Sequence, residues 1–174
     1  MPQSASYRYI VQACCALTAY PEWRMLRSEN ATALASFIFE DILCRWGALA
    51  KIVTDSGPAF VQALDVLADR YNIWHIRISP YNSQANGVVK QHHLDVREAI
   101  IKSTLGGEFH WHTTAHSVFW AERVTVLRST GLSPYFMVHG IEPLFPFDLT
   151  EATFLVPPPD TEPLSSSGLI AWRA

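Results

Sequence analysis

Two polar phrases of the sequence have residue types that bind phosphates or metal ions. Asp55 follows the apolar run "AKIVT" and precedes Ser56-Gly57-Pro58, which predicts a strand end, a turn and a helix start. A carboxylate at the carboxyl end of a strand stands where open α/β sheets bind ligands. The second phrase, "SPYNSQANG" at 79–87, is a polar loop whose glycine lets the backbone approach a phosphate chain. An Asp in this position is also a common turn former, so both interpretations of Asp55 stand.

The segments around these phrases alternate between strand and helix patterns. Apolar and β-branched runs predict strands near residues 7–18, 50–54 and 73–79, with 22–26 as the hairpin partner of the first. Apolar spacing predicts helices over 31–46, 58–71, 88–104 and 111–127, and a short helix within "STGLSPYFMVHG". Asn30 is the expected N-cap of the first helix, and Gly47 its end. This order predicts an α/β fold with helices on both faces of a mixed sheet.

Composition restricts the remaining choices. A chain of 174 residues is one domain by length, predicted here over residues 1–155, with a Pro- and Ser-rich linker and the start of a helix over 156–174. Its three cysteines are too few for a disulfide framework, so we expect an intracellular location, in the nucleus or cytoplasm. The segment 9–19 could instead be a signal-peptide core, although Gln12 interrupts it. No segment has the length of a membrane span. The net charge of −3 excludes an overall basic field, but residues 70–102 carry five basic against two acidic side chains.

Several phrases of the sequence together resemble one family. The phrases are "IVTDSGPAF", "RISPYNSQANGVVKQHH", "FWAERVTVLRSTGLSPYFMVHG" and "PLFPFDL". In this order and spacing they resemble the integrase catalytic core of Ty3/Gypsy-type LTR retrotransposons, over about residues 5–156. The resemblance implies an RNase H-like, three-layer α/β/α fold with a mixed sheet. It also implies binding of DNA, or of RNA, and a homo-oligomer, with DNA strand transfer that uses two Mg²⁺ or Mn²⁺ ions held by two aspartates and a glutamate.

Residue-by-residue comparison with that family finds one of the three metal ligands. Asp55 matches the second aspartate, whereas the glutamate position, 35 residues further on, holds Lys90. The first aspartate of the family would precede Met1. Mg²⁺ takes oxygen ligands, and a protonated amine both fails to ligate and repels the ion. We therefore expect Asp55 to be a remnant of the site, with no metal bound and no catalysis.

The resemblance also suggests contacts with nucleic acid. The candidates are Asn82, Gln84 and Asn86 on the polar loop, and Lys90, His93 and Arg97 on the helix that follows. The pattern H-x-H-x₃-H at His110, His112 and His116 could bind a metal, but it lacks a matching cysteine or carboxylate pattern, and surface histidines are the simpler interpretation.

The resemblance further implies that the family's first strand, the centre of its sheet, is absent from this chain. The strands near 7–18 and 50–54 would then each have an unpaired apolar edge. We expect these two strands either to pair directly or to leave a marginally stable sheet, and we expect no normal five-stranded sheet.

Four functional hypotheses follow, of which the last is a relic reading frame without any function. The first is a degenerate integrase core that retains nucleic-acid contacts without catalysis. The second is a domesticated, non-enzymatic module that binds DNA or RNA or acts as a scaffold. The third is an active strand transferase within a longer chain, which leaves Lys90 to be explained. Mg²⁺-dependent joining separates the third from the others, and salt-sensitive DNA binding separates a DNA-binding module from a scaffold.

Overall fold

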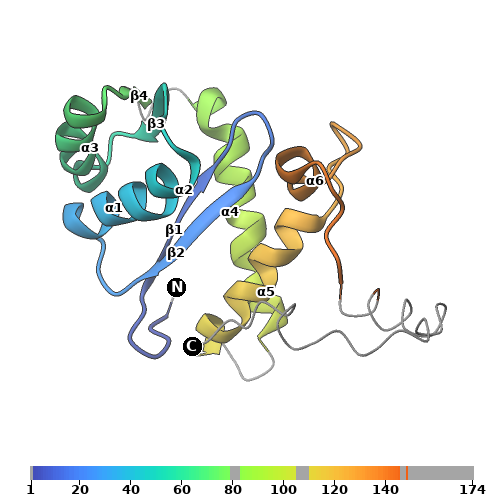
Figure 1. Cartoon of the computed structure of the whole chain (residues 1–174). Coiled ribbons are helices and arrows are strands. Elements are labelled where there is room, and N and C mark those ends of the chain that lie inside the picture. The colour runs from blue at the N-terminus through green and yellow to red at the C-terminus, as the bar shows by residue number, and fades with distance from the viewer. Residues whose placement is uncertain (1, 79–82, 105–109, 146–147, 149–174) are drawn as a thin grey trace, which may run out of the picture. The chain divides into compact units, whose positions relative to one another are not determined.

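The computed structural model describes residues 2–78, 83–104, 110–145 and 148, and for residues 83–92 it describes the backbone alone. The chain divides into two units, Met1–Gly140 and Ile141–Ala174. The predicted boundary at residues 155 and 156 lies outside the described residues. The elements below all belong to the first unit. In chain order they are β1 (Tyr9–Cys14), β2 (Pro21–Leu26), α1 (Ala31–Phe37), the π-helical segment η1 (Ile38–Leu43), α2 (Cys44–Trp46), β3 (Lys51–Asp55), α3 (Pro58–Tyr71), β4 (Trp74–Ile78), α4 (Ser83–Ser103), α5 (Trp111–Val124) and α6 (Pro134–His139) (Figure 1).

Local side-chain chemistry sets the ends of the first helical stretch. Asn30 Oδ1 accepts a hydrogen bond from the Ala33 N–H at 2.8 Å, which is the predicted N-cap. The helix then continues through η1 and α2 as far as Trp46, so the predicted bounds of 31–46 are confirmed. Gly47 ends it with a φ of 82°, a conformation that is easy only for glycine.

The strands form two separate sheets of two strands each. β1 pairs antiparallel with β2, from Tyr9 opposite Leu26 to Cys14 opposite Pro21. β3 pairs parallel with β4 across the α3 connection. The prediction of one mixed sheet is therefore wrong for the described residues, and so is the alternative that β1 pairs directly with β3. The β1–β2 hairpin and the β3–α3–β4 unit each pair strands that are neighbours in the sequence. Among the described residues, no strand pairing connects β1 with β3.

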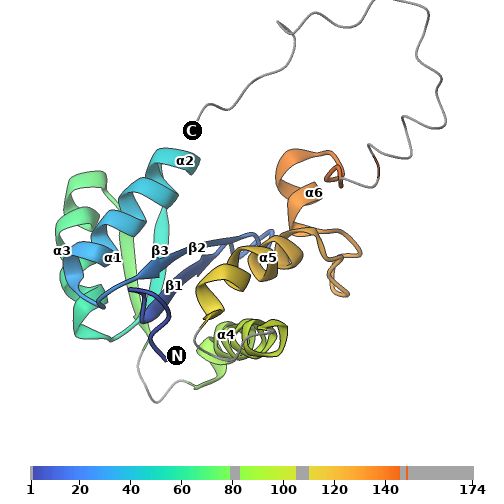
Figure 2. The same cartoon turned by 90° about the horizontal axis from the view of Figure 1, so that it is seen from below.

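The β1–β2 hairpin is covered on both faces (Figure 2). Val11 and Leu26 pack into a first core cluster with α1 and α3, in which Leu34, Phe37 and Leu64 are almost completely buried. The opposite face of the hairpin packs against α4 and α5. Alternate side chains of a strand point to opposite faces, which explains why neighbouring residues of β1 and β2 serve different clusters. The second cluster is formed by Val96, Ile100, Trp111, Ala115, Val118 and Phe119, with Tyr7, Ile10, Trp23, Met25 and Ala99 packed against it.

These layers give a mixed α/β fold with helices on both sides of a central hairpin. In the part of the chain that the structure describes, no helix combines the length and the apolar character that crossing a membrane would require.

Candidate nucleic-acid interface

Asp55 is the last residue of β3, and its side chain closes the turn into α3. Its Oδ1 accepts a hydrogen bond from the Gly57 N–H at 3.1 Å. The neighbouring Ser56 hydroxyl donates to the Ile78 carbonyl at 3.1 Å and so ties this turn to β4. Gly57 is packed closely here, because a Cβ on it would lie 3.0 Å from Asp55 Oδ1. The turn-forming role of Asp55 is thus present in the structure.

The donor set around Asp55 does not fit a pair of divalent ions. Two hard cations bridged for phosphoryl transfer need several carboxylate oxygens directed at one point. Among the described residues, no three His, Cys, Asp or Glu side chains come together in an arrangement that could hold a metal ion. The described side chains around Asp55 therefore do not form a two-metal centre.

The three spaced histidines near α5 have different neighbours. His112 Nδ1 lies 2.6 Å from the Ser4 hydroxyl. His116 packs edge-on against the Trp23 ring, with ring centroids 4.7 Å apart. His110 occupies the position just before α5. Each of the three histidines therefore has its own surroundings, and among the described residues they do not come together to bind one metal ion.

The candidate residues of the polar loop fall in different places from those predicted. α4 begins at Ser83 rather than at 88, so Gln84 and Asn86 lie in the helix and their assignment to a loop is wrong. The physical reason is that a glycine inside a helix costs only about 1 kcal/mol, which the long helix beyond Gly87 tolerates. Asn82, and the side chains of Gln84, Asn86 and Lys90, lie outside the described residues.

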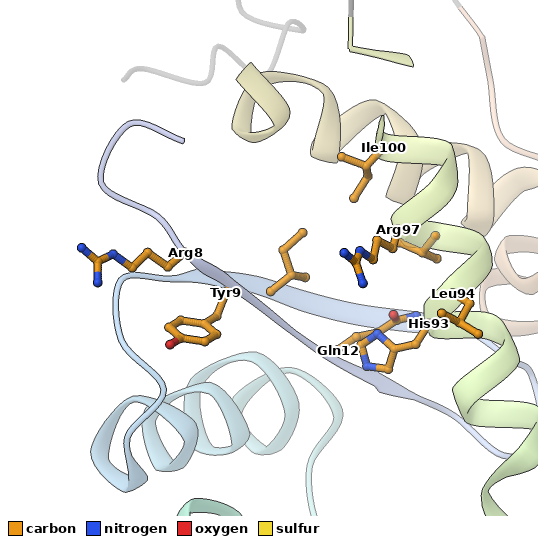
Figure 3. Close-up of a pocket in the computed structure, with 9 residues that line it drawn as sticks. Arg8, Tyr9, Gln12, His93, Leu94, Arg97 and Ile100 are labelled. Carbon is orange, nitrogen blue, oxygen red and sulfur yellow. The ribbon is translucent and has the colours of Figure 1, made fainter. Parts of the chain in front are cut away.

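His93 and Arg97 are the two candidates whose side chains are described. Both are exposed, and they lie one turn apart on α4. Together with Arg8 they border a cavity of about 470 Å³ between β1 and α4. Figure 3 shows the Arg97 side chain extending from α4 toward β1. A positively charged rim over an apolar floor can accept an anion or a polyanion at its edge.

Sequence reasoning missed two polar residues of the hairpin. Glu22 is buried and accepts hydrogen bonds from Arg45 at 2.9 Å, from the Trp46 ring at 2.8 Å and from Arg123 at 3.1 Å. Gln12 faces the cavity, and both polar atoms of its side chain are buried. For Gln12 the sequence carried a signal, since it is the one polar residue in the strand "YIVQAC". For Glu22 no local pattern distinguishes it from a surface residue.

Comparison with known proteins gives a consistent group of relatives, although no family model matches the chain. The chain is 31% identical over 145 residues to the Pol polyprotein of Feline endogenous virus ECE1, covering 82% of this chain and 14% of that protein. It is 31% identical over 145 residues to the Gag-Pol polyprotein of Baboon endogenous virus (strain M7), covering 82% and 8%. The chain thus spans a small part of the length of these relatives.

A solved structure shares the fold. It is a chain in the cryo-EM structure of the simian T-cell lymphotropic virus intasome in complex with the PP2A regulatory subunit B56 gamma. The match has a TM-score of 0.64 and 16% identity, and it covers 89% of this chain and 52% of that one. The expected relationship is therefore supported at the level of retroviral Pol polyproteins, whereas its narrower assignment to Ty3/Gypsy elements stays a prediction. The sequence thus resembles part of retroviral Pol polyproteins, and the chain shares the fold of a chain in that intasome structure.

Proposed function

We propose that this chain is an integrase-like core domain that binds nucleic acid through α4 and does not catalyse DNA strand transfer. The observation that carries the proposal is the similarity to Pol polyproteins over 145 residues, combined with the replacement of a metal-binding glutamate by Lys90. The exposed Arg97 supplies positive charge on α4, and the exposed His93 lies one turn before it. In this proposal the domain derives from a retrotransposon of the Ty3/Gypsy type. The catalytically active members of that family use Mg²⁺ or Mn²⁺, and this chain binds neither ion.

The absence of catalysis follows from charge. A lone carboxylate at Asp55 is already engaged with the Gly57 N–H, and a lysine at the glutamate position adds a positive charge where two dications would need negative ones. The rival hypothesis, an active strand transferase within a longer chain, has the small fraction of the relatives' length in its favour. It has Lys90 against it.

A strand-transfer assay in Mg²⁺ and in Mn²⁺ tests the catalytic half of the proposal. The unaltered chain is compared with K90E carrying an N-terminal extension that supplies an aspartate-bearing strand, and with the same repaired chain bearing D55N. We expect joined product only from the repaired chain, and its loss in D55N. Joined product from the unaltered chain would refute the proposal and establish the rival.

The binding half is tested by fluorescence anisotropy with a labelled DNA duplex across a salt series. Each phosphate contact contributes about −0.9 to the slope of log affinity against log salt. We expect R97A to make that slope less negative by about 0.9, the contribution of one phosphate contact. We also expect R97A to weaken binding to all DNA sequences by a similar factor. R128A removes the same charge from an exposed position outside α4 and is expected to leave the slope unchanged. A slope near zero for the unaltered chain would exclude DNA binding and favour a scaffolding module.

A further inference from the structure

Two adjacent thiols lie where the first strand of the hairpin ends. Cys14 is the last residue of β1, opposite Pro21 of β2, and Cys15 begins the loop that leads to β2. Both cysteines are exposed, and neither belongs to a disulfide. Two neighbouring thiols can react in sequence with one reagent, which a single surface thiol cannot do.

Backbone hydrogen bonds fix the loop on the Cys15 side of the pair. The Cys15 N–H donates to the Tyr20 carbonyl at 3.1 Å, and the Cys15 carbonyl accepts from the Ala19 N–H at 2.9 Å. Both polar groups of the Cys15 main chain are therefore engaged. The fold thus decides which groups surround the Cys15 sulfur.

Thr18 directs a hydrogen bond at that sulfur. Its hydroxyl oxygen accepts from the Tyr20 N–H at 3.3 Å, which leaves the hydroxyl proton to be donated elsewhere. Partial burial acts to raise the pKa of Cys15, but hydrogen bonds from the Thr18 hydroxyl and from the N–H groups of Thr18 and Leu17 lower it overall. Because the thiolate is the nucleophile, Cys15 is the thiol of the pair that reacts first.

Cys14 has different surroundings and suits a second role. Its Sγ lies 3.9 Å from the Cys15 carbonyl oxygen, so the side chain is turned toward the neighbouring residue. Burial, with Cys15 and Glu122 nearby, raises the pKa of the Cys14 thiol to about 11. A protonated thiol reacts slowly with an oxidant in solution. It can still attack a sulfenic acid on the next residue, because the chain holds the two sulfur atoms close together.

A metal ion is the other class of partner that a pair of thiols takes. Zinc sites in proteins use three or four protein ligands. Among the described residues, no third His, Cys, Asp or Glu side chain joins the two thiols in a group that could hold a metal ion. The pair therefore suits covalent sulfur chemistry better than metal binding.

We propose that Cys14 and Cys15 form a dithiol site that a hydroperoxide oxidises reversibly. The Cys15 thiolate attacks the outer peroxide oxygen, the O–O bond breaks, and the departing oxygen takes a proton from water, which leaves Cys15 as a sulfenic acid. The Cys14 sulfur then attacks the Cys15 sulfur, the S–O bond breaks, and the hydroxyl departs as water with the Cys14 proton. The two thiols lose two electrons, and the peroxide gains them. The site lies apart from α4 and does not depend on nucleic-acid binding.

The disulfide between these two residues would be strained. Adjacent Cα atoms are about 3.8 Å apart across a trans peptide, whereas disulfides usually join Cα atoms about 4.4–6.8 Å apart. Strained disulfides are reduced more readily, which is the behaviour of a regulatory bond. The new ring would include the peptide whose N–H donates to the Tyr20 carbonyl, so we expect oxidation to loosen this end of the hairpin.

The test uses the full chain with C44S, in which Cys14 and Cys15 are the remaining cysteines. The reduced protein is treated with hydrogen peroxide, and the tryptic peptide that spans both residues is analysed by mass spectrometry. We expect that peptide to lose two hydrogen atoms, at a yield independent of protein concentration, and to regain them with dithiothreitol. We also expect faster hydrogen exchange at the Cys15 amide after oxidation.

Serine variants separate the two roles. In C14S with C44S, we expect Cys15 to accumulate as a sulfenic acid that dimedone traps. In C15S with C44S, we expect Cys14 to be oxidised at least about tenfold more slowly, because its thiol stays protonated.

Variants of Thr18 test the surroundings of Cys15 in the C14S and C44S background. T18V removes the hydroxyl donor, and we expect oxidation of Cys15 to slow by about threefold or more. T18S keeps the hydroxyl and is expected to keep the rate. T113V is the matched control, since it removes a threonine hydroxyl from an exposed position on α5 and is expected to change nothing.

Several results would overturn the inference. Equal oxidation rates of Cys14 and Cys15 in the two serine variants, or an unchanged rate in T18V, would mean that the loop does not activate Cys15. Oxidised Cys15 beside a free Cys14 thiol in the C44S protein would mean that Cys14 does not complete the reaction. Disulfides found only between chains, on a gel without reducing agent, would mean that the two neighbours cannot close the ring.

Discussion

The two sheets of this protein differ in how far their faces are covered. On the β1–β2 hairpin, Val11 and Leu26 are each 6% exposed, because helices pack on both faces. On the β3–β4 pair, Val53 is 49% exposed and Trp74 is 69% exposed. The hairpin therefore lies at the centre of the hydrophobic packing. Asp55, the expected catalytic remnant, lies on the β3–β4 pair, whose side chains are more exposed.

The largest expected effect is the loss of stability when an ion pair of the hairpin region is removed, compared with an ion pair of the β3–β4 region. In the hairpin region, E22A would remove the buried acceptor of Arg45, Trp46 and Arg123. Breaking a buried ion pair leaves a desolvated charge, so we expect the free energy of unfolding to fall by about 3 kcal/mol. Urea denaturation measures it.

The matched control lies in the other region. The ion pair between Asp65 and Arg77 has a 2.7 Å separation but is about half exposed on both sides. We expect D65A to cost at most about 1 kcal/mol, since water screens such pairs. Equal losses in E22A and D65A would show that the two regions do not differ as described.

The next effect compares apolar truncations on the two sheets. L26A would open space in the first core cluster, where we expect a loss of about 3 kcal/mol from lost burial and the residual cavity. V53A removes methyl groups that are already half in water, and we expect less than about 1 kcal/mol. Both values come from the same urea titration, and a V53A cost as large as that of L26A would contradict the proposed difference in cover.

A smaller effect concerns pH and the β3–β4 pair. Burial, together with the nearby Arg77, lowers the pKa of His75 on β4, and its Nε2 lies 2.8 Å from the Thr54 hydroxyl. The folded state therefore favours neutral His75. Below the unfolded pKa of about 6.5 the unfolded chain binds the proton more readily, so stability falls as the pH falls. Above that pH the contribution of His75 vanishes.

The measurement is chemical denaturation of the unaltered chain and of H75Q between pH 7.5 and 5. We expect the loss of stability on acidification to be smaller in H75Q. An identical slope in the two proteins would mean that His75 does not titrate differently in the folded and unfolded states.

The smallest effect is chemical and lies at the end of β1. Burial, with the neighbouring Cys15 and Glu122, raises the pKa of the Cys14 thiol to about 11. Partial burial also acts on Cys15, yet hydrogen bonds from the side chain and backbone of Thr18 lower its pKa. Because the thiolate is the nucleophile, we expect C14S to be alkylated by iodoacetamide at pH 8 about tenfold faster than C15S, with C44S in both backgrounds. Equal rates would contradict this contrast.

Local chemistry was readable from the sequence alone. The Asn30 cap, the end of the first helix at Gly47, and the bounds of 58–71 for α3 were predicted, and the structure confirms them. Each depends on groups within a few residues, such as a side-chain oxygen facing a free N–H or a proline in the first turn. The family resemblance was equally local, because it rested on short phrases in order, and the Pol polyprotein relatives support its broader form.

Tertiary structure decided what depends on distant pairing. Periodicity could not reveal the separation of the described strands into two sheets, the burial of Glu22 among Arg45 and Arg123, or the burial of the polar side-chain atoms of Gln12. A strand pattern specifies that an edge exists but not which partner fills it, because hydrogen bonds between strands join residues that the sequence places far apart. For the same reason the sequence shows that Gln12 is a polar residue within a strand, whereas its burial depends on the helices that pack around the hairpin.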